Sequence, residues 1–157
     1  MSTDIEQAVA SDAPAVAEMA GELLHEIMAV TGTTSFRFFK FDTEARLRSW
    51  LVDGTYTVLL ARQGPTAVGF LALIENRALY AEGAFGSIPE LYVKLPFRSH
   101  GVGGALLAKA KEVAFGRGWR RLEVTTPPLP QFDRTLAFYQ RQGFEISGGR
   151  KMKFEEP

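Results

Sequence analysis

Near its start, the chain spaces its hydrophobic residues as an amphipathic helix does. Six of them keep the three-four spacing of one buried stripe: Val16, Met19, Ala20, Leu23, Leu24 and Ile27. Ser11 or Asp12 can cap this helix at its beginning. After the aromatic-rich loop TGTTSFRFFKF, a shorter helix is expected to begin at Asp42 and to end at the Asp53-Gly54 turn, with three residues facing inward: Leu47, Trp50 and Leu51.

Runs of β-branched and aromatic residues predict strands in the rest of the chain. A short opening strand is expected near Ile5 to Val9. The runs TYTVLLA and TAVGFLALI, joined by the turn RQGP, predict an antiparallel hairpin. Further strands are expected over residues 87–94 (SIPELYVK) and in RRLEVTT, and a final hairpin is expected through Gly148-Gly149, between FEIS and RKMKF.

Two later helices determine the predicted topology. One is expected from about Gly101 to Phe115, and another from about Phe132 to Gln142, stopped by Gly143. The first of them bridges the strands 88–94 and 119–126, and strands joined through a helix are usually parallel, with a right-handed crossover. The pattern therefore predicts one parallel strand pair inside an otherwise antiparallel sheet.

Composition limits the partners of the chain. Its 157 residues, with 46% apolar and 23% charged content, fit one domain over residues 1–157. Lys+Arg and Asp+Glu both total 18, so no overall field attracts nucleic acid or an anionic membrane. The first thirty residues carry no basic leader, and no apolar run is long enough to span a bilayer. We expect a cytoplasmic protein with neither nucleic acid nor a membrane as partner.

The lack of cysteine excludes several kinds of chemistry. There is no disulfide, no thiolate metal site and no thiol nucleophile, and two histidines are too few for a metal cluster by themselves. We therefore expect no metal.

A glycine-rich junction, PFRSHGVGGALL at residues 96–107, stands between a predicted strand and a predicted helix. Free N–H groups and the helix dipole make such a helix start an anion site, and glycines let a ligand approach the backbone. The Walker pattern is missing, because no Gly-Lys-Ser/Thr occurs, and the dinucleotide pattern fails, because the sixth position from Gly101 is Leu106. A phosphate or pyrophosphate of another kind of ligand is implied.

The residues Arg98-Ser99-His100-Gly101-Val102-Gly103 fit the pattern Gln/Arg-x-x-Gly-x-Gly/Ala. Together with the strand ELYVKLPF, the segment AFYQRQGFE (137–145) and the order of the elements, this motif resembles the GNAT superfamily of acetyl-CoA-dependent N-acetyltransferases, over nearly the whole chain. The resemblance implies an α/β (α+β) fold: a mixed, mostly antiparallel sheet of six to seven strands, with a central parallel pair and helices on both faces.

The resemblance also implies how acetyl-CoA, the expected cosubstrate, is held. The amides from His100 to Gly104, with Arg98, would bind its pyrophosphate, and the pantetheine arm would lie along Val93 and Leu95. If the strand bulges, backbone N–H groups near Tyr92 and Val93 could polarise the thioester carbonyl. The expected coenzyme-binding residues are Tyr92, Val93, Leu95, Arg98, Ser99, His100, Gly101, Val102, Gly103 and Gly104.

Two residues match catalytic positions of the family. Glu90 is expected to accept the amine proton, although a carboxylate on an exposed strand face is the alternative. Tyr139 is expected to protonate the departing thiolate, whereas the alternative is a tyrosine packed with Phe138 and Phe144. The chain departs from the family at Phe132, where an Asn is common, and in the PPLP segment just upstream.

The function implied is transfer of an acetyl group from acetyl-CoA to a primary amine, by direct attack in a ternary complex. The alternative is a catalytically silent CoA-binding sensor or interaction module, which is suggested by Phe132 in place of the common Asn and by the altered link upstream. A small-molecule amine is favoured over a protein as acceptor, and a homodimer is compatible with the resemblance. Four loop phenylalanines, Phe36, Phe38, Phe39 and Phe41, and the long connection 75–86 are candidate walls of the acceptor site.

Overall fold

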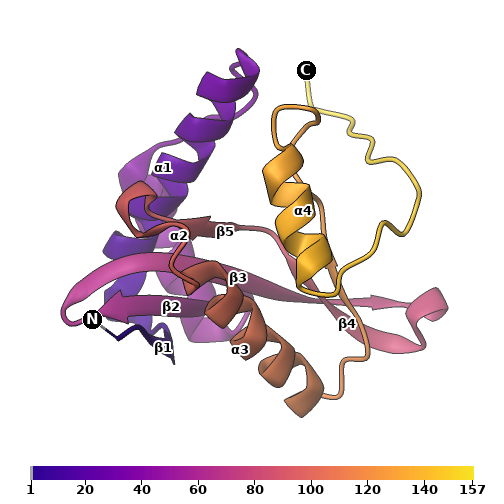
Figure 1. The fold of residues 1–157 in the computed structure, drawn as a ribbon, viewed down its shortest axis with the longest axis horizontal. Helices are drawn as coiled ribbons and strands as arrows, with labels where there is room; N and C mark the ends of the chain where they lie inside the picture. Colours follow the sequence, from indigo (N-terminus) through magenta and orange to yellow (C-terminus); the bar gives the residue numbers. More distant parts are fainter. Residues whose placement is uncertain (1) are drawn as a thin grey trace.

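A six-stranded sheet forms the centre of the computed structural model, which describes residues 2–157 (Figure 1). The helices and strands, in chain order, are β1 (Asp4–Gln7), α1 (Ala13–Thr31), α2 (Lys40–Asp53), β2 (Thr57–Gln63), β3 (Thr66–Ala78), β4 (Gly83–Ile88), β5 (Leu91–Val93), α3 (Val102–Gly116), β6 (Leu122–Val124) and α4 (Asp133–Arg141). Three short 3-10 helices are η1 (Ala10–Asp12), η2 (Leu79–Ala81) and η3 (Leu95–Phe97). The fold expected from the sequence is confirmed.

The two faces of the sheet are covered by different helices (Figure 1). Val58, Phe70 and Tyr92 pack with α1 and α2, whereas Leu59 and Leu71 pack with α3. Successive side chains of a strand point to opposite faces, so β2 and β3 carry unbroken apolar runs where both of their faces are covered. We refer to these two faces as the α1 face and the α3 face.

The start of α1 differs in detail from its predicted cap. Asp12 is the residue that precedes the helix, but its carboxylate accepts the N–H of Val9 at 2.8 Å and pairs with Arg62 at 2.7 Å instead of capping α1. The other end has the expected glycine: Gly32 has φ +70° and donates its N–H to the carbonyl of Met28 at 2.9 Å.

The strand predicted over residues 87–94 is interrupted, and this break shapes the molecule. One part of β3 pairs antiparallel with β4 and another part pairs antiparallel with β5. The predicted parallel pair is confined to residues 86–88 of β4 and 122–124 of β6. Pro89 stands at the break, where it has no N–H for a ladder. Beyond the parallel pair, β5 and the chain after β6 share no ladder, and the sheet opens.

Two other predictions were wrong. The segment 75–86 is not a long connection, because β3 and β4 continue through it and pair Ala78 with Gly83 around η2. The C-terminal hairpin is absent from the described chain: residues 144–157 contain no strand. Gly148 and Gly149 do turn the chain with positive φ, but the apolar residues beside them, Ile146, Met152 and Phe154, stay exposed and find no sheet to pack on.

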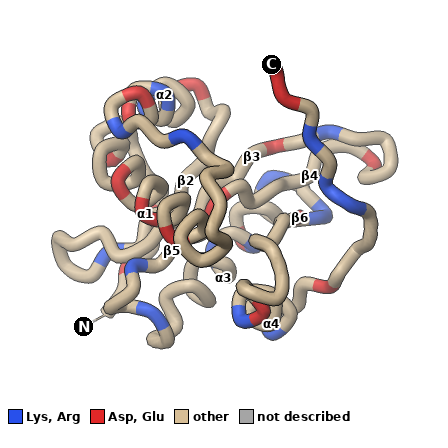
Figure 2. Tube along the Cα trace, turned by 90° about the horizontal axis from the view of Figure 1, so that it is seen from above, with Lys and Arg blue, Asp and Glu red and all other residues tan. Residues whose placement is uncertain are grey.

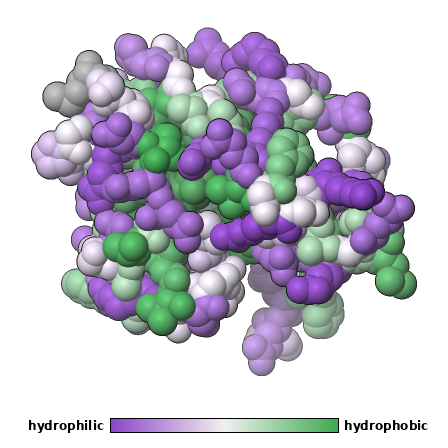
Figure 3. Space-filling model, turned by 90° about the horizontal axis from the view of Figure 1, so that it is seen from below, coloured by the Kyte–Doolittle hydropathy of each residue, from purple (hydrophilic) through white to green (hydrophobic). Residues whose placement is uncertain are grey.

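The surface carries both signs of charge. Lys and Arg are interspersed with Asp and Glu along the trace (Figure 2), in keeping with the equal totals in the sequence. In the face shown in Figure 3, hydrophobic residues form small patches between hydrophilic ones. A helix with the length and apolarity to cross a bilayer does not occur within residues 2–157.

Candidate functional site

A cleft of about 1310 Å³ lies where the sheet opens. Its walls come from α1, from β5, from the first turn of α3, and from α4 with the chain before it. All the catalytic and coenzyme-binding residues expected from the sequence line it except His100, whose side chain is exposed. The cleft therefore brings together expected site residues that are up to 49 positions apart in the chain, from Glu90 to Tyr139.

The hydrogen bonding of β5 leaves backbone groups available to the cleft. Lys94 N–H donates to the Val68 carbonyl, and Ala72 N–H donates to the Glu90 carbonyl, both at 2.9 Å. In an antiparallel ladder the direction alternates, so Leu91 and Val93 point their backbone groups away from β3. Of the two expected amides, Val93 N–H therefore faces the opening, whereas Tyr92 N–H lies on the β3 side.

The turn before α3 has a strained backbone. Ser99 has φ +65° and Gly101 has φ +85°, both in the left-handed region, which is unusual for serine. The first hydrogen bond of the helix runs from Ala105 N–H to the Gly101 carbonyl at 3.0 Å. The N–H groups of residues 102–104 thus have no acceptor within the helix, and they lie at the positive end of its dipole. This first turn can bind an anion.

Glycine has a second purpose in this turn. A Cβ added to Gly103 would meet the ring of Phe138, and one added to Gly104 would meet the side chain of Gln142. Both neighbours belong to the segment around α4. Gly103 thus lets α4 pack closely on the first turn of α3, whereas at Gly104 a Cβ would make only an ordinary contact.

Arg98 joins the turn to α1. Its Nε donates to the Val93 carbonyl at 2.7 Å, and its Nη2 pairs with Glu26 of α1 at 2.7 Å. Tyr92, beneath the guanidinium, donates its hydroxyl to Glu22 of α1 at 3.0 Å. Burial, with this hydrogen bond, raises the pKa of Tyr92 to about 12. These contacts fix the open end of β5 against α1.

Glu90 is not a solvated surface acid. It is partly buried, and its carboxylate accepts the hydroxyl of Tyr56 at 3.0 and 3.3 Å. Tyr56 in turn packs against Trp50 of α2, with the ring centroids 4.7 Å apart. Burial raises the pKa of Glu90, and the hydrogen bond from Tyr56 partly offsets this. A carboxylate with a raised pKa in a cleft is a candidate general base.

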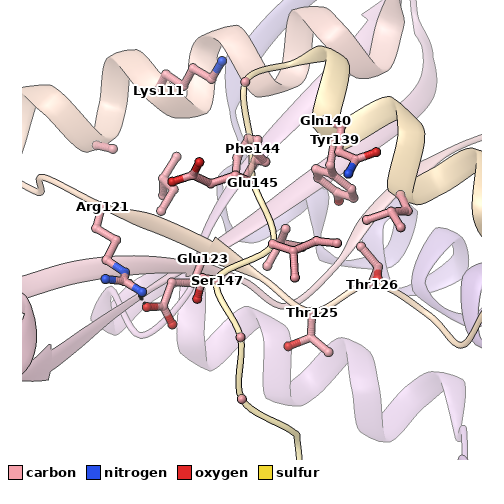
Figure 4. Close-up of a pocket in the computed structure, with 18 of the residues that line it drawn as sticks. Lys111, Arg121, Glu123, Thr125, Thr126, Tyr139, Gln140, Phe144, Glu145 and Ser147 are labelled. Atoms are coloured by element: carbon pink, nitrogen blue, oxygen red, sulfur yellow. Dashed lines mark ion pairs between the residues drawn. The ribbon is translucent and has the colours of Figure 1, made fainter.

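Tyr139 is packed among aromatic side chains and also lines the cleft. Its ring is buried at 5% exposure and packs edge-on between Phe138 and Phe144 at 5.3 and 5.4 Å. It also lines the cleft and a neighbouring cavity of about 1000 Å³ between α3, α4 and the C-terminal segment. Figure 4 shows this second cavity, with Lys111 on α3 and Thr125 after β6 around it. Burial raises the pKa of Tyr139, so the phenol keeps its proton at neutral pH.

Sequence reasoning missed three residues of this region: Glu22, Glu26 and Tyr56. The spacing of Glu22 and Glu26, four apart on a predicted helix, signals that they share one face. Nothing local marks Tyr56, because its partner Glu90 is 34 positions away. Of the aromatic loop, only Phe36 lines the cleft. Phe38 packs over Gly21, while Phe39 and Phe41 are 65% and 79% exposed.

Comparison with known proteins identifies the family. The family model described as Acetyltransferase (GNAT) family matches residues 24–144. No curated protein sequence matches the chain significantly. The chain belongs to the GNAT acetyltransferase family, and it is thus an acyltransferase enzyme. The resemblance found in the sequence is confirmed.

Solved structures agree on the fold. An aminoglycoside acetyltransferase from an uncultured soil metagenomic sample, in complex with trehalose, is 18% identical, with a TM-score of 0.76 over 98% of this chain and 97% of that one. A ribosomal-protein-alanine N-acetyltransferase from Brucella melitensis biovar Abortus 2308 is 20% identical, with a TM-score of 0.72 over 98% and 100%. A predicted acetyltransferase from Clostridium acetobutylicum, in a structure with acetyl-CoA, is 13% identical, with a TM-score of 0.77 over 97% and 96%.

Proposed function

We propose that this chain transfers the acetyl group of acetyl-CoA to a primary amine by direct attack in a ternary complex. The observation that carries the proposal is the meeting, in one cleft, of the first-turn amides of α3, the outward Val93 N–H and the Glu90 carboxylate. These groups match the three needs of the reaction, which are an anion site, a donor to a carbonyl and a base.

The α3 face would hold the coenzyme. Its diphosphate suits the amides of residues 102–104, since free N–H groups and the helix dipole favour negative charge there. The pantetheine arm fits along β5, past Leu95 and Val93, which line the cleft. Val93 N–H would then donate to the thioester oxygen, where negative charge develops during attack.

Glu90 and Tyr139 would act as the general base and the general acid of the reaction. Glu90 takes a proton from the ammonium form of the acceptor, directly or through water, and leaves a neutral amine. The amine nitrogen bonds to the carbonyl carbon, the carbon–sulfur bond breaks, and the sulfur leaves as a thiolate. Tyr139 protonates that thiolate and regains its proton from solvent, and the nitrogen releases its second proton as the amide forms.

A thiol-release assay with acetyl-CoA and a panel of amines tests the proposal. We expect release that depends on an amine and that falls about 100-fold in Tyr139→Phe, while the dissociation constant of CoA stays unchanged. Phenylalanine keeps the packing against Phe138 and Phe144, so the fold should persist. Tight CoA binding with no turnover on any amine would instead identify a silent coenzyme-binding module.

A further inference from the structure

The α1 face of the cleft differs from the α3 face in the side chains that line it. Along β5 and the residue before it, Glu90 and Tyr92 alternate with Leu91 and Val93. Tyr92 packs with α1 and α2, whereas Leu91 and Val93 pack with the α3 cluster. Glu90, which bonds to Tyr56 next to α2, therefore lies on the α1 face. If the coenzyme lies along the α3 face, the amine must reach Glu90 from the α1 face.

The α1 face of the cleft is mostly apolar. From α1 come Leu23, Leu24 and Ile27, and from the loop that follows comes Phe36, which keeps 41% of its surface exposed. Where the chain returns after β6, Pro127, Pro128 and Phe132 line the same cleft. An acceptor that enters here meets hydrocarbon on several sides.

Charges on this wall are few. The helix α1 contains no Lys or Arg. Its one acid in the lining, Glu26, already pairs with Arg98 at 2.7 Å. Glu90 is thus the carboxylate left to receive a cation, and it accepts a hydrogen bond from an uncharged tyrosine hydroxyl. The other basic residues of the lining, Arg134, Arg141 and Lys151, belong to α4 and the C-terminal segment.

We infer that the acceptor is a monoamine with an apolar body, such as an alkyl- or arylalkylamine, and this inference rests on the proposed function. The ammonium group meets Glu90, and the hydrocarbon part lies against α1 and Phe36. A second ammonium group at the far end of the acceptor would be buried without a partner, which is costly. The wall therefore selects against polyamines and aminoglycosides.

Hexylamine and 1,5-diaminopentane test this directly, because they have the same number of non-hydrogen atoms and differ in a terminal methyl or ammonium group. We expect kcat/KM for hexylamine to exceed that for the diamine at least about tenfold, as burial of an unpaired charge predicts. A ratio near one, or a preference for the diamine or for an aminoglycoside, overturns the inference and leaves the acetyltransferase proposal standing. No thiol release with any amine overturns both.

Two variants test whether the preference for a monoamine arises at Phe36. Phe36→Asp gives the second ammonium group a carboxylate, so the hexylamine-to-diamine ratio should fall about tenfold. Phe39→Asp changes the same residue type in the same loop but outside the lining, and its ratio should stay that of the wild type. An equal fall of the ratio in both variants would contradict a role for the apolar α1 face of the cleft. The wild-type ratio is measured without either variant, so the inference stays testable if one fails to fold.

Discussion

The two sides of the cleft present different kinds of groups. On the α3 side of the cleft, the groups that face the opening are main-chain amides, at the first turn of α3 and at Val93. On the α1 face, the groups are side chains, namely Glu90 with Tyr56 and the apolar wall around Phe36. Main-chain donors recognise what all acyl-CoA molecules share, while side chains can change with the acceptor and leave the backbone intact.

This difference predicts that variants divide into two kinds. Changes on the α3 face should alter coenzyme affinity whichever amine is used. Changes on the α1 face should alter turnover and amine choice while the coenzyme binds normally.

The largest effect is expected from Glu90→Gln. Without the base, kcat/KM should fall about 100-fold or more, with an unchanged CoA dissociation constant measured by calorimetry. Glu112→Gln, which changes an exposed acid on α3 outside the cleft lining, should keep wild-type kinetics.

The melting temperature of Glu90→Gln distinguishes the loss of the base from a loss of the fold. Because burial raises the pKa of Glu90, its ionisation costs folding free energy as the pH rises through that pKa. Gln does not ionise and can still accept the Tyr56 hydrogen bond. The variant should therefore melt at the wild-type temperature or above it at neutral pH, and a clearly lower melting temperature would contradict the burial of the acid.

An intermediate effect is expected from Gly101→Ala, with Gly32→Ala as its match. Both glycines have left-handed φ, +85° and +70°, and open space around a Cβ. Each change should cost about 1 to 2 kcal/mol of unfolding free energy. Only the methyl at 101 would project where the cleft lies, so only that variant should bind CoA about tenfold more weakly. Equal CoA affinities in the two variants would show that the turn at Gly101 is not part of the coenzyme site.

Much of the α3 side of the cleft could be predicted from the sequence, because the groups that it presents belong to the backbone. The motif from Arg98 to Gly103 and the helix after it mark an anion site by local spacing alone. The break at Pro89 and the outward direction of the Val93 N–H depend on the pairing of β5 with β3, which no local pattern encodes.

The α1 face was harder to predict for the same reason. Tyr56 and Glu90 meet only in the fold, and only one of the four loop phenylalanines reaches the cleft. The C-terminal strand pattern failed because alternation of residues shows that a segment can pair, but not that a neighbouring strand is available to it.

The smallest effect is a pH shift in Tyr56→Phe. The base must be ionised, so kcat/KM should fall as the pH drops through the raised pKa of Glu90. The Tyr56 hydroxyl stabilises the carboxylate, and its removal should raise that pKa further and move the acidic limb upward by up to about one pH unit. A limb that stays in place, or that moves to lower pH, would contradict the assignment of Glu90 as the base.

The most direct test of the central claim is a calorimetric titration of the wild-type chain with acetyl-CoA and with S-acetylpantetheine, which has the thioester but no diphosphate. If the amides at the start of α3 hold the diphosphate, acetyl-CoA should bind with one-to-one stoichiometry, and the truncated thioester at least about 100-fold more weakly. Equal affinities for the two thioesters, or no heat with acetyl-CoA, would contradict the account.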